Sequence, residues 1–349
     1  MITFLMVIIF LAILIIGHEF GHFLTAKFFG LKVEEFGFGF PPQLFKKKIG
    51  DTTYTINAIP FGGFVKIYGE DGDISATSDN SNANVSVEPG SFQSLSLWKK
   101  AIIIAAGAFM NFIIGWFAIT GVFLIGTNSS VVVGHVANNS PAATSGLMPG
   151  DQIKDFPKIE DFVAFIDNNK GKAINLEVIR GDKDVQVSVT PRLSPPSGEG
   201  PIGVSLIEGG IPKESFFNSI KDGFTTSVKL LGLIYRSIYS LFARLFTGDL
   251  GVTSQFTGPV GIFSFIDAAG KLGFAHLLQI LAIISLNLAA LNIIPFPALD
   301  GGRLLFMVYE KVSGGRLSKK VESTSHLVGF AILIVIMVLV TIKDIINLV

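Results

Sequence analysis

The sequence predicts a polytopic α-helical membrane protein with about four transmembrane helices and one inserted β-rich domain. Three observations lead to this fold class: 49% of the 349 residues are hydrophobic, only 15% are charged, and four long apolar stretches stand out. Ordinary globular chains carry about 25% charged residues. Acidic and basic residues balance at 27 each, which argues against a nucleic-acid partner. Cysteine is absent, so any metal must be held by His, Asp or Glu.

The apolar stretches give four predicted spans, each close to or above the ~20 residues that cross a bilayer. They are residues 1–29, 100–126, 274–302 and 326–349. Lysine and arginine gather in the segments 30–99 and 303–325, so we expect both segments to be cytoplasmic loops. The long segment between the second and third spans is then extracytoplasmic.

Residues 127–193 of this outer segment form the inserted domain. Val131–Val133 and Ile174–Ile179 are typical of buried strands, and Val185, Val187 and Val189 alternate with polar residues. This pattern resembles a bacterial PDZ domain, and such domains bind an extended peptide at a sheet edge. A peptide ligand is therefore expected there. The alternative is a domain that only spaces or shields the membrane part.

Residues 194–273 are predicted to be a linker followed by an amphipathic helix. Residues 216–246 place apolar side chains at helical spacing, but Arg236 and Arg244 fall in the apolar half. An arginine at mid-bilayer costs ~2.5–3.5 kcal/mol, so a helix lying on the outer leaflet is favoured over a fifth span. A fifth span would move the third predicted span to the opposite orientation.

The most informative motif is the run HEFGH, which contributes His18, Glu19 and His22. On a helix, positions i and i+4 share one face, so both imidazoles can bind one Zn²⁺ while the glutamate reaches a metal-bound water. The motif lies inside the first span, where ionisable side chains cost insertion energy and bring no structural benefit. We therefore predict a zinc site there.

A catalytic zinc needs a third protein ligand and an open coordination position. Asp300 follows the apolar part of the third span, in the run SLNLAALNIIPFPALDGG (285–302). Four spans place it on the same, cytoplasmic side as the paired histidines. Pro295 and Pro297 interrupt the helix just before it, so irregular backbone can turn the carboxylate inward. His326 lies on the same side and is the weaker alternative.

HEFGH in a first span, LDG near the end of a later one and a PDZ-like insert together resemble the site-2 protease family of intramembrane zinc metalloproteases, in particular its bacterial RseP type. The resemblance implies Zn²⁺ held by His18, His22 and Asp300, with Glu19 as the catalytic acid/base. It also implies a multi-pass protein of the bacterial cytoplasmic membrane whose active site lies toward the cytoplasm. Its substrates would be single-pass transmembrane proteins already cleaved on the extracytoplasmic side, such as anti-sigma factors or remnant signal peptides.

The resemblance extends to residues near the substrate. The runs FGFGF (36–40) and INAIPFGGFVKIYGE (56–70) resemble membrane-associated β-hairpin segments of the family, and a turn with an aromatic membrane anchor is the alternative. The implied substrate-binding residues are Gly37, Gly39, Gly62, Gly63, Asn287 and Asn292. For the two asparagines, a role in helix packing is the alternative. Gly107 and Asn111 match a family Gly-Pro-x-x-Asn pattern in which Ala108 replaces the proline.

Two other classes of function are weighed against the protease. One is a catalytically inactive membrane scaffold that binds peptides through its PDZ-like domain, and the presence of all four catalytic residues argues against it. The other is a transporter with an intramembrane ion pathway. The inverted repeats that would favour a transporter are not visible in the sequence.

Overall fold

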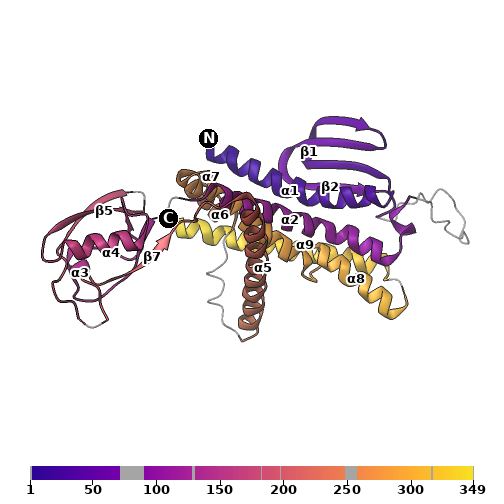
Figure 1. Ribbon diagram of the computed structural model, residues 1–349. Coiled ribbons are helices and arrows are strands. Elements are labelled where there is room, and N and C mark those ends of the chain that lie inside the picture. The colour runs from indigo at the N-terminus through magenta and orange to yellow at the C-terminus, as the bar shows by residue number, and fades with distance from the viewer. Residues whose placement is uncertain are drawn as a thin grey trace, which may run out of the picture. The chain divides into compact units, whose positions relative to one another are not determined.

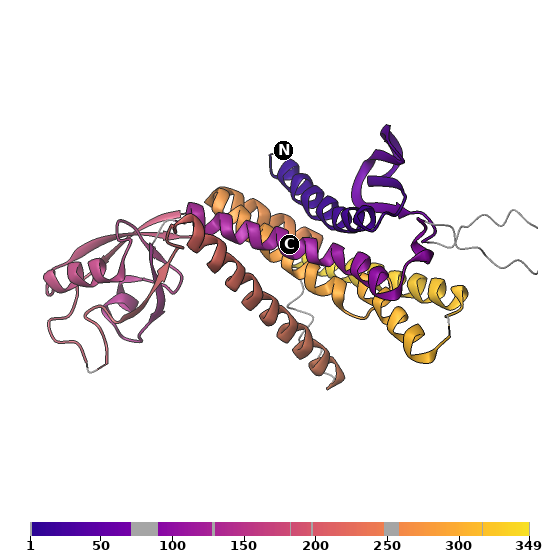
Figure 2. The ribbon, with the colours of Figure 1, turned by 45° about the vertical axis from the view of Figure 1, so that its right-hand side comes forward.

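The computed structural model describes residues 2–70, 90–127, 130–181, 183–196, 198–247, 258–315 and 317–348 (Figures 1 and 2). Residues 71–89 of the predicted loop 30–99 thus lie outside the described residues. The chain forms two compact units, one of Met1–Gly121 with Ile220–Val349 and one of Val122–Ser219.

Within the part of the chain that the structure describes, four helices are long and apolar enough to cross a membrane, which confirms the predicted number of spans by length and composition. They are α1 (Ile2–Phe28), α2 (Leu97–Ile125), α7 (Phe274–Ile293) and α9 (Lys319–Leu348). Their apolar spans cover Leu5–Phe28, Leu97–Ile125, Phe274–Ile293 and Lys320–Ile346.

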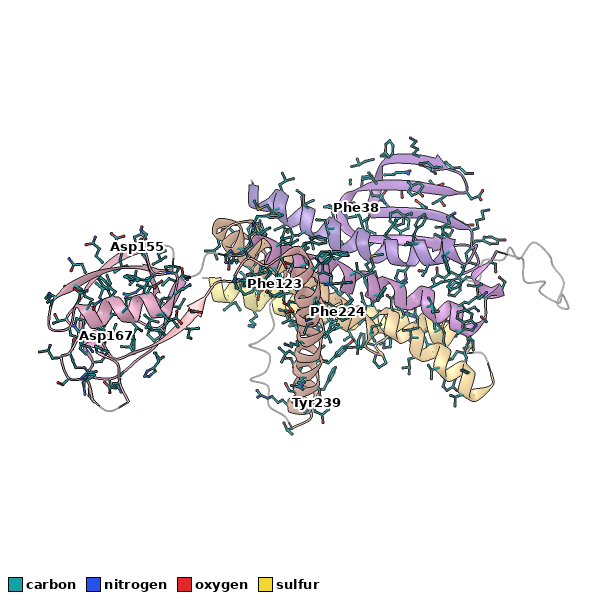
Figure 3. The ribbon with its side chains drawn as sticks, viewed as in Figure 1. Phe38, Phe123, Asp155, Asp167, Phe224 and Tyr239 are labelled. Carbon is teal, nitrogen blue, oxygen red and sulfur yellow. The ribbon has the colours of Figure 1, made fainter. Side chains whose placement is uncertain are left out.

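The predicted amphipathic helix is α5 (Phe216–Phe246), which has the length of a span but not the apolar composition. Its Phe224, labelled in Figure 3, packs edge-on against Trp116 of α2 with ring centroids 5.2 Å apart. The Trp116 ring N–H donates to the Ile220 carbonyl at 3.0 Å. This end of α5 is therefore fixed to a membrane helix, and its position on the outer leaflet stays a prediction.

Two long strands, β1 (Val33–Ile49) and β2 (Thr52–Ile67), form one antiparallel sheet beside α1 (Figure 1). Both strands bend, because the backbone around Phe38 pairs both with Gly63 and with Ile56. The sheet therefore has four antiparallel segments side by side, in the order 63–67, 33–38, 53–57 and 43–49. The segment 63–67 is one edge. A short helical turn, η1 (Phe92–Ser94), then leads into α2.

The third membrane helix differs from its prediction. It ends at Ile293 rather than residue 302, because Pro295 and Pro297 cannot continue the backbone hydrogen bonds. After an irregular loop the chain forms α8 (Asp300–Ser313), a helix that begins in the last residues of the predicted span 274–302 and continues into the predicted loop 303–325. A further unpredicted helix, α6 (Pro259–Leu272), precedes α7 within the predicted segment 194–273.

The second unit is a five-stranded antiparallel sheet in the order β6-β5-β4-β3-β7, with two helices. Its elements are β3 (Ser130–Val136), α3 (Pro141–Ser145), β4 (Gln152–Ile153), α4 (Ile159–Asn168), β5 (Ile174–Arg180), β6 (Lys183–Val189) and β7 (Val204–Gly209). Phe162 and Ile166 of α4 are buried in the core with Ile202. The domain thus extends beyond residue 193, the boundary predicted from the sequence, because Ile202 completes its core and β7 completes its sheet. Its PDZ-like character stays a prediction.

Candidate metal centre

His18 and His22 lie one turn apart on α1, and both side chains are largely buried, at 16% and 13% exposed. The i, i+4 spacing places the two rings on one helix face, edge to face, with centroids 4.8 Å apart and planes nearly perpendicular. Their Nε2 atoms are 3.3 Å apart. The helix alone therefore brings two nitrogen ligands to one point.

Asp300, the first residue of α8, brings its carboxylate to the same point. Its Oδ2 lies 3.2 Å from Nε2 of His18 and 3.4 Å from Nε2 of His22. Ligands bound at about 2.0–2.1 Å in a tetrahedral zinc site stand ~3.3 Å from one another. The three atoms thus form one face of such a tetrahedron. Within the described parts of the chain, no other three His, Asp or Glu side chains meet in this way.

The residues present fit a zinc ion. Oδ2 of Asp300 is buried and has no hydrogen-bond partner, although the Nε2 atoms of His18 and His22 lie 3.2 and 3.4 Å away. An uncompensated buried carboxylate oxygen is costly unless a cation neutralises it. Two imidazoles and one carboxylate are a donor set of catalytic zinc sites, which keep a fourth position open.

Neighbouring groups fix which nitrogen each histidine offers. Nδ1 of His22 donates to the Ile103 carbonyl of α2 at 2.8 Å, so its Nε2 carries the lone pair that faces the centre. Nδ1 of His18 contacts the amides of Asn111 at 3.3 Å and Asn292 at 3.4 Å. A rotated amide offers its oxygen there, and a His18 that binds metal through Nε2 donates Nδ1–H to it.

Helix α2 forms the back wall of the centre. A Cβ on Gly107 would stand 2.6 Å from Cε1 of His18 and 2.7 Å from Cε1 of His22, well inside contact distance. Only glycine therefore lets α2 approach the two imidazoles. One turn further along, the Asn111 carbonyl accepts a hydrogen bond from Ser285 of α7 at 2.7 Å. This bond ties α2 to α7 beside the site.

Glu19 follows the candidate ligand His18 on α1, and its side chain contacts the edge of the β-sheet. A Cβ on Gly63 would stand 2.9 Å from Cγ of Glu19 and 2.8 Å from Cγ2 of Ile15. The edge segment 63–67 of β2 therefore contacts α1 at the run HEFGH. Backbone that approaches a carboxylate this closely requires a residue without a side chain.

The other predicted substrate residues are divided between the sheet and a separate cavity. Gly37 pairs with Phe64 and Thr55 inside the sheet, and Gly39 and Gly62 adopt left-handed backbone at its bends, with φ of 81° and 89°. Asn287 donates to the Ile283 carbonyl at 2.9 Å. Its side chain lines a cavity of about 280 Å³ between α5 and α7. The structure thus brings Gly63 and Asn292 to the metal centre, but not Asn287.

Several supporting residues were not assigned a role from the sequence. Gly107 and Asn111 were recognised only as part of a family pattern. Their spacing of four residues puts them on one face of a helix, and this was the signal that could have assigned them to the site. The sequence did not indicate the Ile103 carbonyl, because every residue has a backbone carbonyl and the residue type does not show which one accepts a hydrogen bond from His22. His326, the alternative third ligand, is not in the cluster: its Nδ1 accepts from the Ala298 N–H at 3.1 Å.

Comparisons with known proteins point to one family. A family model described as peptidase family M50 matches residues 6–336, a range that includes all three candidate ligands. The chain is 35% identical to a Clostridium perfringens protein named as a candidate zinc metalloprotease, with 95% of each chain covered. It is 31% identical to a similarly named Nostoc protein, with 96% of this chain and 93% of that one covered. It is 28% identical to the regulator of sigma-W protease RasP of Bacillus subtilis, with 98% of both covered.

Proposed function

The chain belongs to peptidase family M50, and we propose that it is an intramembrane zinc metalloprotease that cleaves peptide bonds within transmembrane segments of single-pass membrane proteins. It is a metallopeptidase, and its cofactor is Zn²⁺. The observation that carries the proposal is the triangle of His18, His22 and Asp300: the two histidines lie on α1, whose composition suits a bilayer, and Asp300 follows α7, which is also apolar and long enough to span one. A soluble protease would not need to build its site from such helices.

The proposed mechanism assigns one role to each side chain. His18, His22 and Asp300 would hold the ion, which supplies Lewis acidity toward a carbonyl oxygen and acidifies water. Glu19 accepts the proton of the attacking water and then delivers it to the leaving amine nitrogen. Its position next to His18 on α1, with Cγ against Gly63 of the sheet edge, supports this role.

The sheet edge explains how a helical substrate could be opened. In a helix every interior carbonyl is hydrogen-bonded, which shields it from attack. Among the described residues, segment 63–67 pairs with residues 33–38 on one side and with no strand on the other, so that other side can hold an extended strand by backbone hydrogen bonds. Gly63 lies in this segment beside Glu19, which would bring the unwound substrate to the catalytic carboxylate.

We further propose a bacterial cytoplasmic membrane location, with the active site toward the cytoplasm and the second unit outside. The lysine-rich segments 30–99 and 303–325 support this orientation. Among the described strands of the second unit, β7 pairs with β3 alone, so a peptide could add to its other edge as in a PDZ domain. The relative from Bacillus subtilis is named as a regulatory protease, which favours regulated cleavage of pre-trimmed membrane proteins here as well.

The test is Glu19→Gln in the full-length protein, reconstituted with a single-span model substrate. We expect about one zinc per chain in both the wild type and the variant, and cleavage within the span by the wild type only. Full cleavage by the variant would contradict the role of Glu19. Wild-type protein that binds zinc but cleaves nothing would instead favour the scaffold, and protein that binds no zinc would remove the basis of the proposal.

A further inference from the structure

The third candidate metal ligand, Asp300, directly follows an irregular loop and is the first residue of α8. Residues 294–299 connect α7 to α8, and Asp300 follows directly. Cβ atoms on Gly301 and Gly302 would collide with the carbonyls of Ile294 and Phe296. The loop therefore folds back onto the first turn of its own helix, and glycine is required at both positions.

The loop contains one residue, Ala298, in a strained backbone conformation that needs contacts from its surroundings. Ala298 has a φ of 79°, the left-handed region in which an alanine side chain crowds its own backbone. Such residues persist where the surroundings over-determine them, and they concentrate at functional sites. Here the strained residue lies two positions before Asp300.

Helix α9 supplies the support from the other side. The Ala298 N–H donates to Nδ1 of His326 at 3.1 Å, and the ring of His326 packs edge-on against Phe306 of α8 at 5.7 Å. Three residues further along α9, Gly329 is buried against the Pro297 carbonyl, where a Cβ would collide. The loop is thus enclosed between α8 and α9, and His326 makes the side-chain hydrogen bond to its strained residue.

We propose that His326 is a positioning residue for the metal centre. Its imidazole, with the proton on Nε2, accepts the Ala298 N–H and holds residues 296–299 in the conformation that directs the Asp300 carboxylate at His18 and His22. The fourth membrane helix thereby takes part in zinc binding without providing a ligand. The inference rests on the proposed zinc site and adds a residue that acts on it through the backbone.

The test compares two replacements in the full-length protein, one without and one with a hydrogen-bond acceptor near the position of Nδ1. His326→Phe keeps a ring against Phe306 but offers no acceptor, whereas His326→Asn places Oδ1 near the position of Nδ1. Leu327→Ala, at the adjacent and largely exposed position, is the control for a change in α9. Zinc affinity is measured by competition with a chelator, and hydrogen exchange at Ala298 is measured in the metal-free protein.

For His326→Phe we expect a zinc dissociation constant raised about 10–100-fold, as for other groups that orient metal ligands. We also expect faster exchange at Ala298, a lower kcat and little change in KM. His326→Asn should recover zinc affinity to within a few-fold, and Leu327→Ala should match the wild type. Wild-type zinc affinity in His326→Phe, or equal losses in the Phe and Asn variants, would overturn the proposal. Either result would leave the zinc site itself intact, whereas wild-type protein without zinc would refute the proposed function.

Discussion

Replacing Gly107 by alanine is the sharpest test of the metal geometry, because it adds one methyl group at the back wall of the site. The new Cβ would lie 2.6 Å from Cε1 of His18 and 2.7 Å from Cε1 of His22, and closer still to Nε2 of His22. Ordinary contact begins at 3.4 Å, so the His18 ring must move by about 0.8 Å and the His22 ring by more. That shift is large beside a metal–nitrogen bond of about 2.0–2.1 Å.

The expected loss is in function rather than in folding. Overpacking costs about 1–3 kcal/mol, and the better helix propensity of alanine returns about 1 kcal/mol. A displacement near 1 Å at a reacting group costs on the order of 100-fold in rate, and disturbed ligand geometry lowers metal affinity about 10–100-fold. We therefore expect Gly107→Ala to fold while binding zinc weakly and cleaving a membrane-embedded substrate about 100-fold more slowly.

The assay pairs chelator competition with cleavage in proteoliposomes. Gly121→Ala is the matched control, because it makes the same change on the same helix and meets only the terminal Cδ1 of Leu278, at 2.9 Å. It should retain zinc affinity and turnover. A Gly107→Ala protein with wild-type zinc affinity and turnover would show that the two imidazoles do not occupy the described positions during catalysis.

Four further outcomes are expected. Asp300→Asn should lower zinc affinity by more than the ~10–100-fold typical of a supporting residue, measured by chelator competition. Chelation of the wild type should abolish cleavage, and added Zn²⁺ should restore it; retained cleavage would exclude a metalloprotease. Glu70 pairs with Arg303 at 2.5 Å, so removing either charge should lower the unfolding free energy by up to about 3 kcal/mol, and exchanging the two should recover part of it. Burial would raise the pKa of Asp151, but bonds from Arg180 and a backbone N–H hold that pKa below its usual range. The carboxylate therefore contributes its full stabilisation of the second unit above about pH 4. This stabilisation is lost as the pH falls through the lowered native pKa of Asp151. Hydrogen exchange in β5 measures the loss, with Asp151→Asn as the reference.

Much of the fold could be predicted because the determining signals are local or compositional. Four apolar stretches predict four membrane helices, and the interrupting arginines separated α5 from them. The strands β3, β5 and β6 follow from apolar runs and alternation. The helices α6 and α8 were missed, since short helices between spans resemble loops in composition.

The sequence by itself determined the chemistry of the centre: the i, i+4 spacing of His18 and His22 is a property of one helix, and span parity put Asp300 on their side. Only the tertiary structure decided how that chemistry is held. Gly107 behind the imidazoles, the carbonyl of Ile103 on His22 and the hydrogen bond from Ala298 to His326 join segments 28 to 89 residues apart. Contacts of this kind depend on how helices pack across the whole unit. Helix packing leaves no periodic pattern in the sequence, so these contacts could not be predicted from it.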